Sequence, residues 1–323
     1  MPLAPHRHRF LTSLAHRHRR DAARRQVSSS RERADKLQLP DIVTRALMRP
    51  GSYVGWLREL LVTGVCLVCY PFGIGGTTPE SPSGASPTPF SALEPDAAPV
   101  LLVHGYGHNR SGWTFLARHL RRGGFEHVYS LNYNPLAGDL PGLAWELSRR
   151  IDAIREVTGA RRVHLVGHSL GGILIRYYVQ LLGGEACVDT AITLASPHEG
   201  TLAAGLGRSS VLRQLRPGSW VIQALEETAR PSPVQWMAYY SNLDALVQPA
   251  SSAMLRHPAL DATNVLVKDH GHLSILLAPG LGRSIAHRLA ASGGLSGSDA
   301  SQSAAEDEFG SPGLRPAAHA EPA

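Results

Sequence analysis

A pentapeptide near the middle of the chain constrains the fold more than any other feature: Gly167-His168-Ser169-Leu170-Gly171. It lies between an apolar run at 163–166, typical of a buried strand, and a helical pattern at 171–182. A sharp turn from strand to helix leaves Ser169 at the apex, where side chains at 167 and 171 would collide with neighbouring backbone. The motif therefore predicts a nucleophilic serine, and the free N–H groups of the helix favour a developing anion beside it.

Strand and helix patterns alternate on both sides of this motif. Residues 139–157 have helical spacing with Asp139 as a capping residue, and a last helix is expected to start near Ser274. The other expected strands are 100–103, 128–131, 191–195, 236–240 and 265–267. This alternation predicts an α/β fold with a mostly parallel central sheet and helices on both faces.

A serine hydroxyl needs a base to remove its proton and an acid that orients the base and stabilises its charged form. With this strand–turn–helix motif, the chain order is serine, acid, histidine. Asp244 lies just beyond the strand that ends near Tyr240, so it is the preferred acid. Asp261 precedes its own strand and would lie at the opposite edge of the sheet.

Two histidines, His270 and His272, follow the expected strand at 265–267 and would both reach the correct edge. Gly271 and His272 stand directly before the expected apolar helix, and the glycine allows the loop to bring the imidazole inward. His272 is therefore the predicted base, and His270 is the less favoured alternative. Asp269 is their chain neighbour, which is a poor position from which to orient the imidazole.

The anion formed at the reacting carbon requires two N–H donors. One is the backbone amide of Leu170, the residue after the nucleophile. The other is expected from the glycine-containing loop at 104–107, where the amide of Tyr106 is the preferred donor. We interpret His104 and His168 as structural, because His104 can brace this loop and His168 would project away from the reacting atom.

Positive charge is concentrated in the first 40 residues. Ten Arg and Lys against three acids give this segment +7, so a total of +6 leaves −1 for the rest of the chain and no reason to expect nucleic-acid binding. The three cysteines imply no disulfide framework. Cys66 and Cys69 have no second Cys or His pair nearby, so we interpret them as cysteines of a buried helix rather than a zinc or redox site.

Composition divides the chain into five parts. Residues 1–40 predict a disordered basic arm, 41–75 a helical and hydrophobic segment, and 76–96 a linker rich in Pro, Ser and Gly. Residues 97–292 form the predicted catalytic domain, and 293–323 a disordered tail.

The apolar run within 53–74 is shorter than the ~20 residues that span a membrane comfortably, and Arg58 and Glu59 interrupt its start. A helix packed on the body is the preferred interpretation, with a membrane anchor or an uncleaved export signal as the alternative. A basic arm beside such a segment would be attracted to anionic lipid. Localisation stays open among membrane-associated, secreted and cytoplasmic.

Five blocks, beginning at Pro99, Val163, Ala195, Ser241 and Gly271, resemble the bacterial triacylglycerol lipase and esterase family of the α/β-hydrolase superfamily. They resemble particularly its actinomycete-like branch and the small lipases of Bacillus. The resemblance implies an α/β-hydrolase fold and ester hydrolysis through an acyl-enzyme, without a cofactor. It implies a triad of Ser169, Asp244 and His272 and an oxyanion hole made by the amides of Tyr106 and Leu170. No His/Asp cluster matches the metal sites of some relatives, so no metal is carried over.

Two other functions stay open at this point. One is an acyltransferase on the same fold, which hands the acyl group to an alcohol other than water. The other is a non-catalytic binding protein of hydrolase-like fold, although such proteins usually lose a triad member. Residues 202 to about 235 are apolar enough to line an acyl pocket or form a small cap, with ordinary helix packing as the alternative. Acyl chain length and oligomeric state are not predicted.

Overall fold

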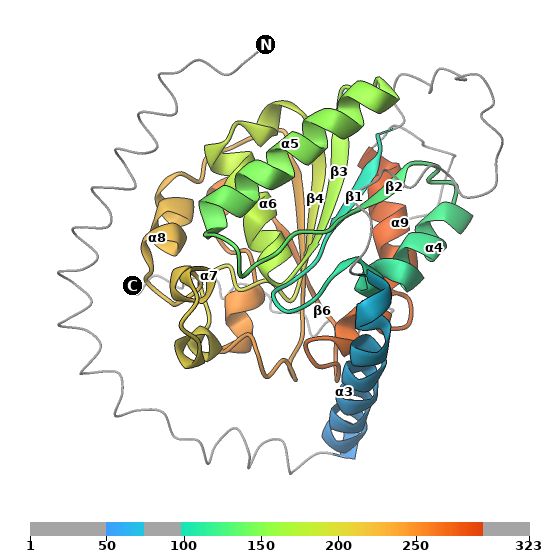
Figure 1. The fold of residues 1–323 in the computed structure, drawn as a ribbon, viewed down its shortest axis with the longest axis vertical. Helices are drawn as coiled ribbons and strands as arrows, with labels where there is room; N and C mark the ends of the chain where they lie inside the picture. The colour runs from blue at the N-terminus through green and yellow to red at the C-terminus, as the bar shows by residue number, and fades with distance from the viewer. Residues whose placement is uncertain (1–49, 74–97, 293–323) are drawn as a thin grey trace, which may run out of the picture.

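The computed structural model describes residues 50–73 and 98–292; the expected basic arm, linker and tail lie outside these ranges. Among the described residues, six parallel strands form one sheet in the order β2-β1-β3-β4-β5-β6 (Figure 1). The strands are β1 (Val100–Val103), β2 (Val128–Leu131), β3 (Val163–His168), β4 (Val188–Leu194), β5 (Gln235–Tyr240) and β6 (Thr263–Leu266). The expected parallel α/β sheet is confirmed, with strand ends shifted by up to three residues.

Helices cover both faces of this sheet (Figure 1). The α-helices are α3 (Pro50–Cys69), α4 (Thr114–Arg122), α5 (Leu140–Thr158), α6 (Leu170–Leu181), α7 (Ser210–Gln214), α8 (Trp220–Glu227) and α9 (Leu281–Ser292). Short 3-10 helices are η2 (Tyr70–Gly73), η3 (Arg110–Trp113), η4 (Gly184–Ala186), η5 (Leu202–Leu206), η6 (Ala250–Ala253), η7 (Pro258–Leu260) and η8 (Ser274–Leu277).

Two apolar layers hold the helices to the sheet. On one face, Ile151 of α5 and Ile173 of α6 pack with Leu165 of β3 in one buried cluster. On the other face, Leu120 of α4 and Ile285 of α9 belong to a second cluster with strand residues. Each fully buried side chain of this kind contributes about 1.5–3 kcal/mol relative to exposure. The strand ends then fix where the loops that follow them begin.

The helix expected near Ser274 begins later than the sequence indicated. Residues Ser274–Leu277 form only the 3-10 turn η8, and α9 starts at Leu281. Pro279 explains the difference, because proline disfavours a helical conformation at the residue before it, and Ala278 is accordingly extended with ψ 131°. The cap at Asp139 is confirmed: its carboxylate accepts a hydrogen bond from the Gly142 amide over 3.1 Å.

Helix α3 packs on the body along one side only. Val62 is buried there, and a side chain at Gly55 would meet Leu243 at 2.4 Å, so the helix lies close to the loop after β5. Most of its apolar side chains instead face outward. Cys66 and Cys69 lie on a helix as expected, but they are half-buried and not buried. In the described parts of the chain, no helix meets the length and hydropathy of a membrane span.

Candidate active site

Ser169 occupies the turn between β3 and α6 with φ 54° and ψ −120°, a conformation that L-residues rarely adopt. A side chain at Gly167 would lie 2.6 Å from the carbonyl carbon of Gly171, and one at Gly171 would lie 2.1 Å from the carbonyl oxygen of Val103. The flanking glycines are therefore required by backbone contacts, as the sequence predicted. Strain of this kind at a half-buried serine is typical of a functional turn.

The loops after β5 and β6 bring Asp244 and His272 together. Tyr240 pairs with Leu266 in the sheet, so the two loops start side by side. Nδ1 of His272 lies 2.8 Å from Oδ2 of Asp244, and the exposed fractions of these residues are 6% and 1%. With its Nδ1–H donated to the carboxylate, the imidazole keeps Nε2 available as a proton acceptor.

The second oxygen of Asp244 is held by its own loop. Oδ1 accepts hydrogen bonds from the amides of Leu246 and Val247, each over 2.8 Å. Thr201 fixes the same loop by donating to the carbonyl of Leu246 and accepting from the amide of Gln248. The carboxylate is therefore oriented before any substrate arrives. Asp261, the competing acid, lies before β6 at the opposite edge of the sheet.

His168 connects the turn at Ser169 to the loop of His272. Its Nε2–H donates to the carbonyl oxygen of His272 over 2.8 Å, and the two rings lie 4.7 Å apart. Burial lowers the pKa of His168 well below its usual value, with the nearby His272 adding to the effect, so it stays neutral. Its structural interpretation is supported, because it ties the loop of His272 to the residue that precedes Ser169.

The protonation of His272 reflects opposing influences. Burial lowers the pKa of His272, but the charge and the hydrogen bond of Asp244, together with the charge of Glu59, raise it. The net result is a pKa above the usual value of 6.5. A base of this kind is neutral, and hence active, only on the alkaline side of that pKa.

Glu59 of α3 reaches the same loop from the other end of the chain. Its two carboxylate oxygens accept hydrogen bonds from the amides of Leu273 and Ser274, over 2.7 and 2.8 Å. Glu59 therefore caps η8, the turn that follows His272 directly. A side chain at Gly271 would lie 2.4 Å from the carboxylate carbon of Glu59, so only glycine leaves room for this contact.

Arg58, the neighbour of Glu59, engages the alternative histidine. Its guanidinium donates to the carbonyl of Asp269 over 3.1 Å and to Nε2 of His270 over 2.9 Å, while Nδ1–H of His270 donates to the carbonyl of Lys268 over 2.7 Å. Both ring nitrogens of His270 are thus occupied, which disfavours it as the base. The sequence showed Arg58 and Glu59 only as two charges that interrupt an apolar run.

The loop after β1 lies against Ser169, because Val103 pairs with Gly167 in the sheet. A side chain at Gly105 would lie 2.9 Å from the β-carbon of Ser169, so glycine allows this approach. His104 is buried and stacks on Tyr133, with ring centroids 4.2 Å apart, and burial lowers its pKa to about 4. Its interpretation as a brace of the loop is supported. The hydroxyl of Tyr106 donates to Ser209 over 3.2 Å.

The segment from 202 to 235 packs largely against the core. Val211 of α7 and Val221 and Leu225 of α8 are buried in the main core, which is ordinary helix packing. Leu202 and Leu206 of η5 are exposed. Only η5 therefore offers apolar side chains that are free of the core. Among the described residues, no group of three or more His, Cys, Asp and Glu side chains is arranged to hold a metal ion.

The fold agrees with comparison to known proteins. A model of the alpha/beta hydrolase family matches residues 100–290, more than half of the chain. The chain belongs to the alpha/beta hydrolase family. This alpha/beta hydrolase is similar in fold to the mature form of the Bacillus licheniformis lipase BlEst2, with a TM-score of 0.52 and 20% identity over 62% of this chain and 95% of that chain. The propeptide form of BlEst2 matches with the same TM-score and identity, over 61% of this chain and 50% of that chain.

Proposed function

We propose that this alpha/beta hydrolase cleaves carboxylic esters, with Ser169 as nucleophile, His272 as base and Asp244 as the acid that orients it. The observation that carries the proposal is the buried contact of 2.8 Å between His272 and Asp244, in a loop that His168 ties to the turn at Ser169. The order of the three residues along the chain is the order used on this fold.

The proposed reaction is acyl transfer to water in two steps. His272 Nε2 takes the proton of Ser169 as its hydroxyl oxygen attacks the ester carbonyl, and the resulting imidazolium is stabilised by Asp244. The protonated His272 then gives that proton to the departing alcohol, which leaves an acyl-enzyme. Water, deprotonated by His272, attacks the acyl-enzyme and releases the acid and free Ser169.

We assign the oxyanion hole to the backbone amides of Leu170 and Tyr106. Leu170 begins α6 directly after the nucleophile, and Tyr106 follows the glycine whose backbone approaches Ser169. Each such donor is worth about 3 kcal/mol at the transition state. The sequence blocks shared with bacterial triacylglycerol lipases and esterases, and a fold like that of BlEst2, support a lipase or carboxylesterase within the hydrolase family.

A direct test combines turnover with covalent labelling. The purified protein is expected to hydrolyse short p-nitrophenyl esters and to lose this activity when one equivalent of an organophosphate ester reacts with Ser169, located by peptide mass mapping. A panel of esters from acetate to palmitate then separates carboxylesterase from triacylglycerol lipase. Labelling at a different residue, or no ester turnover at all, would contradict the proposal.

Glu59 is a positioning residue for His272 in this mechanism, which gives a second prediction. Glu59→Gln removes one of two acceptor oxygens, so the loop that carries His272 is held less firmly. It also removes a negative charge, so the pKa of His272 falls. We expect kcat/KM to drop by about tenfold, since a hydrogen bond to a charged group contributes about 1.5–3 kcal/mol. The acid-side midpoint of the pH–rate profile should move to lower pH.

The matched control for this prediction is Glu156→Gln, an exposed carboxylate on α5 that has the same charge change. A role of Glu59 in folding alone would reduce the amount of folded protein without moving the midpoint. An unchanged kcat/KM and an unchanged midpoint in Glu59→Gln would exclude the positioning role.

We also propose that the enzyme contacts a membrane surface through α3. The helix exposes Leu60, Leu67 and Val68, each about 70% accessible, and the chain before it is strongly basic. Removing residues 1–75 is a poor test of this contact, because it would also remove Glu59 and loosen the base loop. Substitutions on the outer side of α3 leave the polar contacts of the helix in place.

A further inference from the structure

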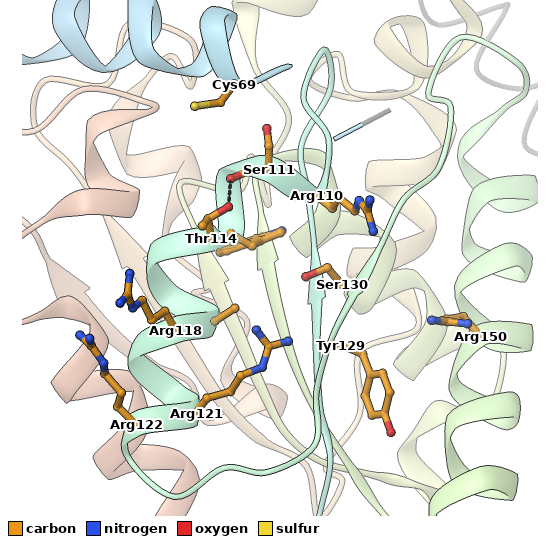
Figure 2. Close-up of a pocket in the computed structure, with 12 residues that line it drawn as sticks. Cys69, Arg110, Ser111, Thr114, Arg118, Arg121, Arg122, Tyr129, Ser130 and Arg150 are labelled. Atoms are coloured by element: carbon orange, nitrogen blue, oxygen red, sulfur yellow. Dashed lines mark hydrogen bonds between the residues drawn. The ribbon is translucent and has the colours of Figure 1, made fainter. Parts of the chain in front are cut away.

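A cavity of about 780 Å³ lies between α4, β2 and α5, beyond the end of α3 (Figure 2). It is separate from the loops that carry Asp244 and His272. No aspartate or glutamate is among the described residues that line it. Its charged lining consists of five arginines: Arg110, Arg118, Arg121, Arg122 and Arg150.

The arginines reach the cavity from three elements (Figure 2). Arg118, Arg121 and Arg122 come from α4, where their spacing places them on neighbouring positions of the helix, and Arg150 comes from α5 on the other side of β2. The guanidinium of Arg121 is held by the carbonyl of Val128 over 2.8 Å. Figure 2 shows Arg121 and Arg150 reaching toward each other, whereas Arg118 and Arg122 point to the other side of α4. Positive charge therefore lies on both sides of this helix, which favours an anionic surface placed against it.

The chemistry of the lining indicates a phosphate group. Guanidinium groups present several N–H donors in a planar fork, which binds two oxygens of a phosphate group at once, and a phosphate has further oxygens for a second guanidinium. Ser111, Thr114 and Ser130 also line the cavity, and the hydroxyl of Thr114 donates to the carbonyl of Ser111 over 2.7 Å.

Apolar side chains surround this basic cavity on the same part of the molecule. A second hollow, of about 670 Å³, lies on the other side of α4 and is lined by Phe115 and Leu277 together with Arg118 and Arg122. Phe115 is 62% exposed. Cys69, at the end of α3, lines the first cavity. The exposed apolar side of α3 is therefore adjacent to the cavity that the arginines line. A basic surface beside exposed apolar side chains is typical of proteins that bind membrane interfaces.

We propose that the arginine cavity binds the phosphate of anionic phospholipid headgroups, while the outer side of α3 lies among the acyl chains. The inference deepens the proposed membrane contact and does not depend on ester hydrolysis. The turn η8 contacts both α3 and α4, so a membrane bound here lies next to the loop of His272. The loop that carries His272, the proposed base, would then face the lipid surface.

The test measures binding of the full-length protein to vesicles of phosphatidylcholine, with and without phosphatidylglycerol. The triple variant Arg118→Gln/Arg122→Gln/Arg150→Gln should weaken binding to the anionic vesicles by at least about tenfold, since each basic side chain near such a surface contributes about 1 kcal/mol. A matched triple variant with the same charge change, Arg149→Gln/Arg208→Gln/Arg213→Gln, should weaken it by less than about twofold. Leu67→Asn/Val68→Asn should weaken binding to both kinds of vesicle.

Three outcomes would overturn the proposal. Equal losses in the two arginine variants would mean that only total charge matters. Unchanged vesicle binding in the cavity variant would exclude the headgroup site. If inorganic phosphate bound to the wild type and not to the cavity variant in calorimetry, while vesicle binding stayed the same, the cavity would serve a free phosphate instead. Hydrolysis of soluble p-nitrophenyl butyrate should be equal in all variants, so a failure of the catalytic proposal is seen separately.

Discussion

Ser169→Ala is expected to lower kcat for short p-nitrophenyl esters by ~10⁴-fold or more. In the proposed mechanism the loss is large because the hydroxyl oxygen is the atom that forms the acyl-enzyme, and neither His272 nor Asp244 could substitute for it. Residual turnover would come from binding and from the N–H donors of Leu170 and Tyr106, which can still stabilise an anion formed by attacking water.

This prediction is tested by measuring steady-state kinetics and the unfolding temperature of each variant. Ser251→Ala, a half-buried serine of η6 outside the proposed site, is the matched control and should keep wild-type rates. Both variants should unfold at nearly the same temperature as the wild type, because a half-buried hydroxyl contributes little to stability. Near-native activity of Ser169→Ala would show that another residue is the nucleophile.

Asp244→Asn is expected to lower kcat by about 10⁴-fold although the side chain has almost the same shape. The amides of Leu246 and Val247 need an acceptor, so the amide oxygen of the asparagine must take the place of Oδ1. Its NH₂ group then faces Nδ1 of His272. The imidazole must accept there and carry its proton on Nε2, where it cannot receive the proton of Ser169.

The pH–rate profile provides an independent readout of this variant. The Asp244 charge raises the pKa of His272, so its removal should move the acid-side midpoint to lower pH, at the same time as the maximal rate falls. Asp261→Asn is the control, since Asp261 lies at the other edge of the sheet, and it should leave the profile unchanged. Activity of Asp244→Asn within about tenfold of wild type would rule out Asp244 as the orienting acid.

The sequence predicted the parts of the fold that depend on local patterns. The turn at Ser169 was visible because its glycines are required by contacts within a few residues and with the adjacent strand. The sheet was visible because buried parallel strands are continuous apolar runs, as at Val100–Val103. The start of the last helix was wrong because the apolar pattern continues through 274–277, whereas Pro279 permits α9 only from Leu281.

Contacts between distant parts of the chain could not be predicted in the same way. Glu59 and Leu273 are separated by 214 residues, and no periodicity links a charge in an apolar helix to the amides of a remote turn. The hydrogen bond between Arg58 and His270 joins residues 212 positions apart, so it could not be predicted for the same reason. In both cases the available sequence signal was that two adjacent charged residues, Arg58 and Glu59, interrupt an apolar segment.

The cap that Glu59 provides has a consequence for how the enzyme is made. The carboxylate is synthesised early, and the turn that it caps is synthesised 214 residues later. During translation the Glu59 carboxylate therefore lacks its hydrogen bonds to Leu273 and Ser274 until the segment after β6 has left the ribosome. Because the proposed base His272 lies in the same late segment, it can be positioned only after the loop that follows β6 has been synthesised.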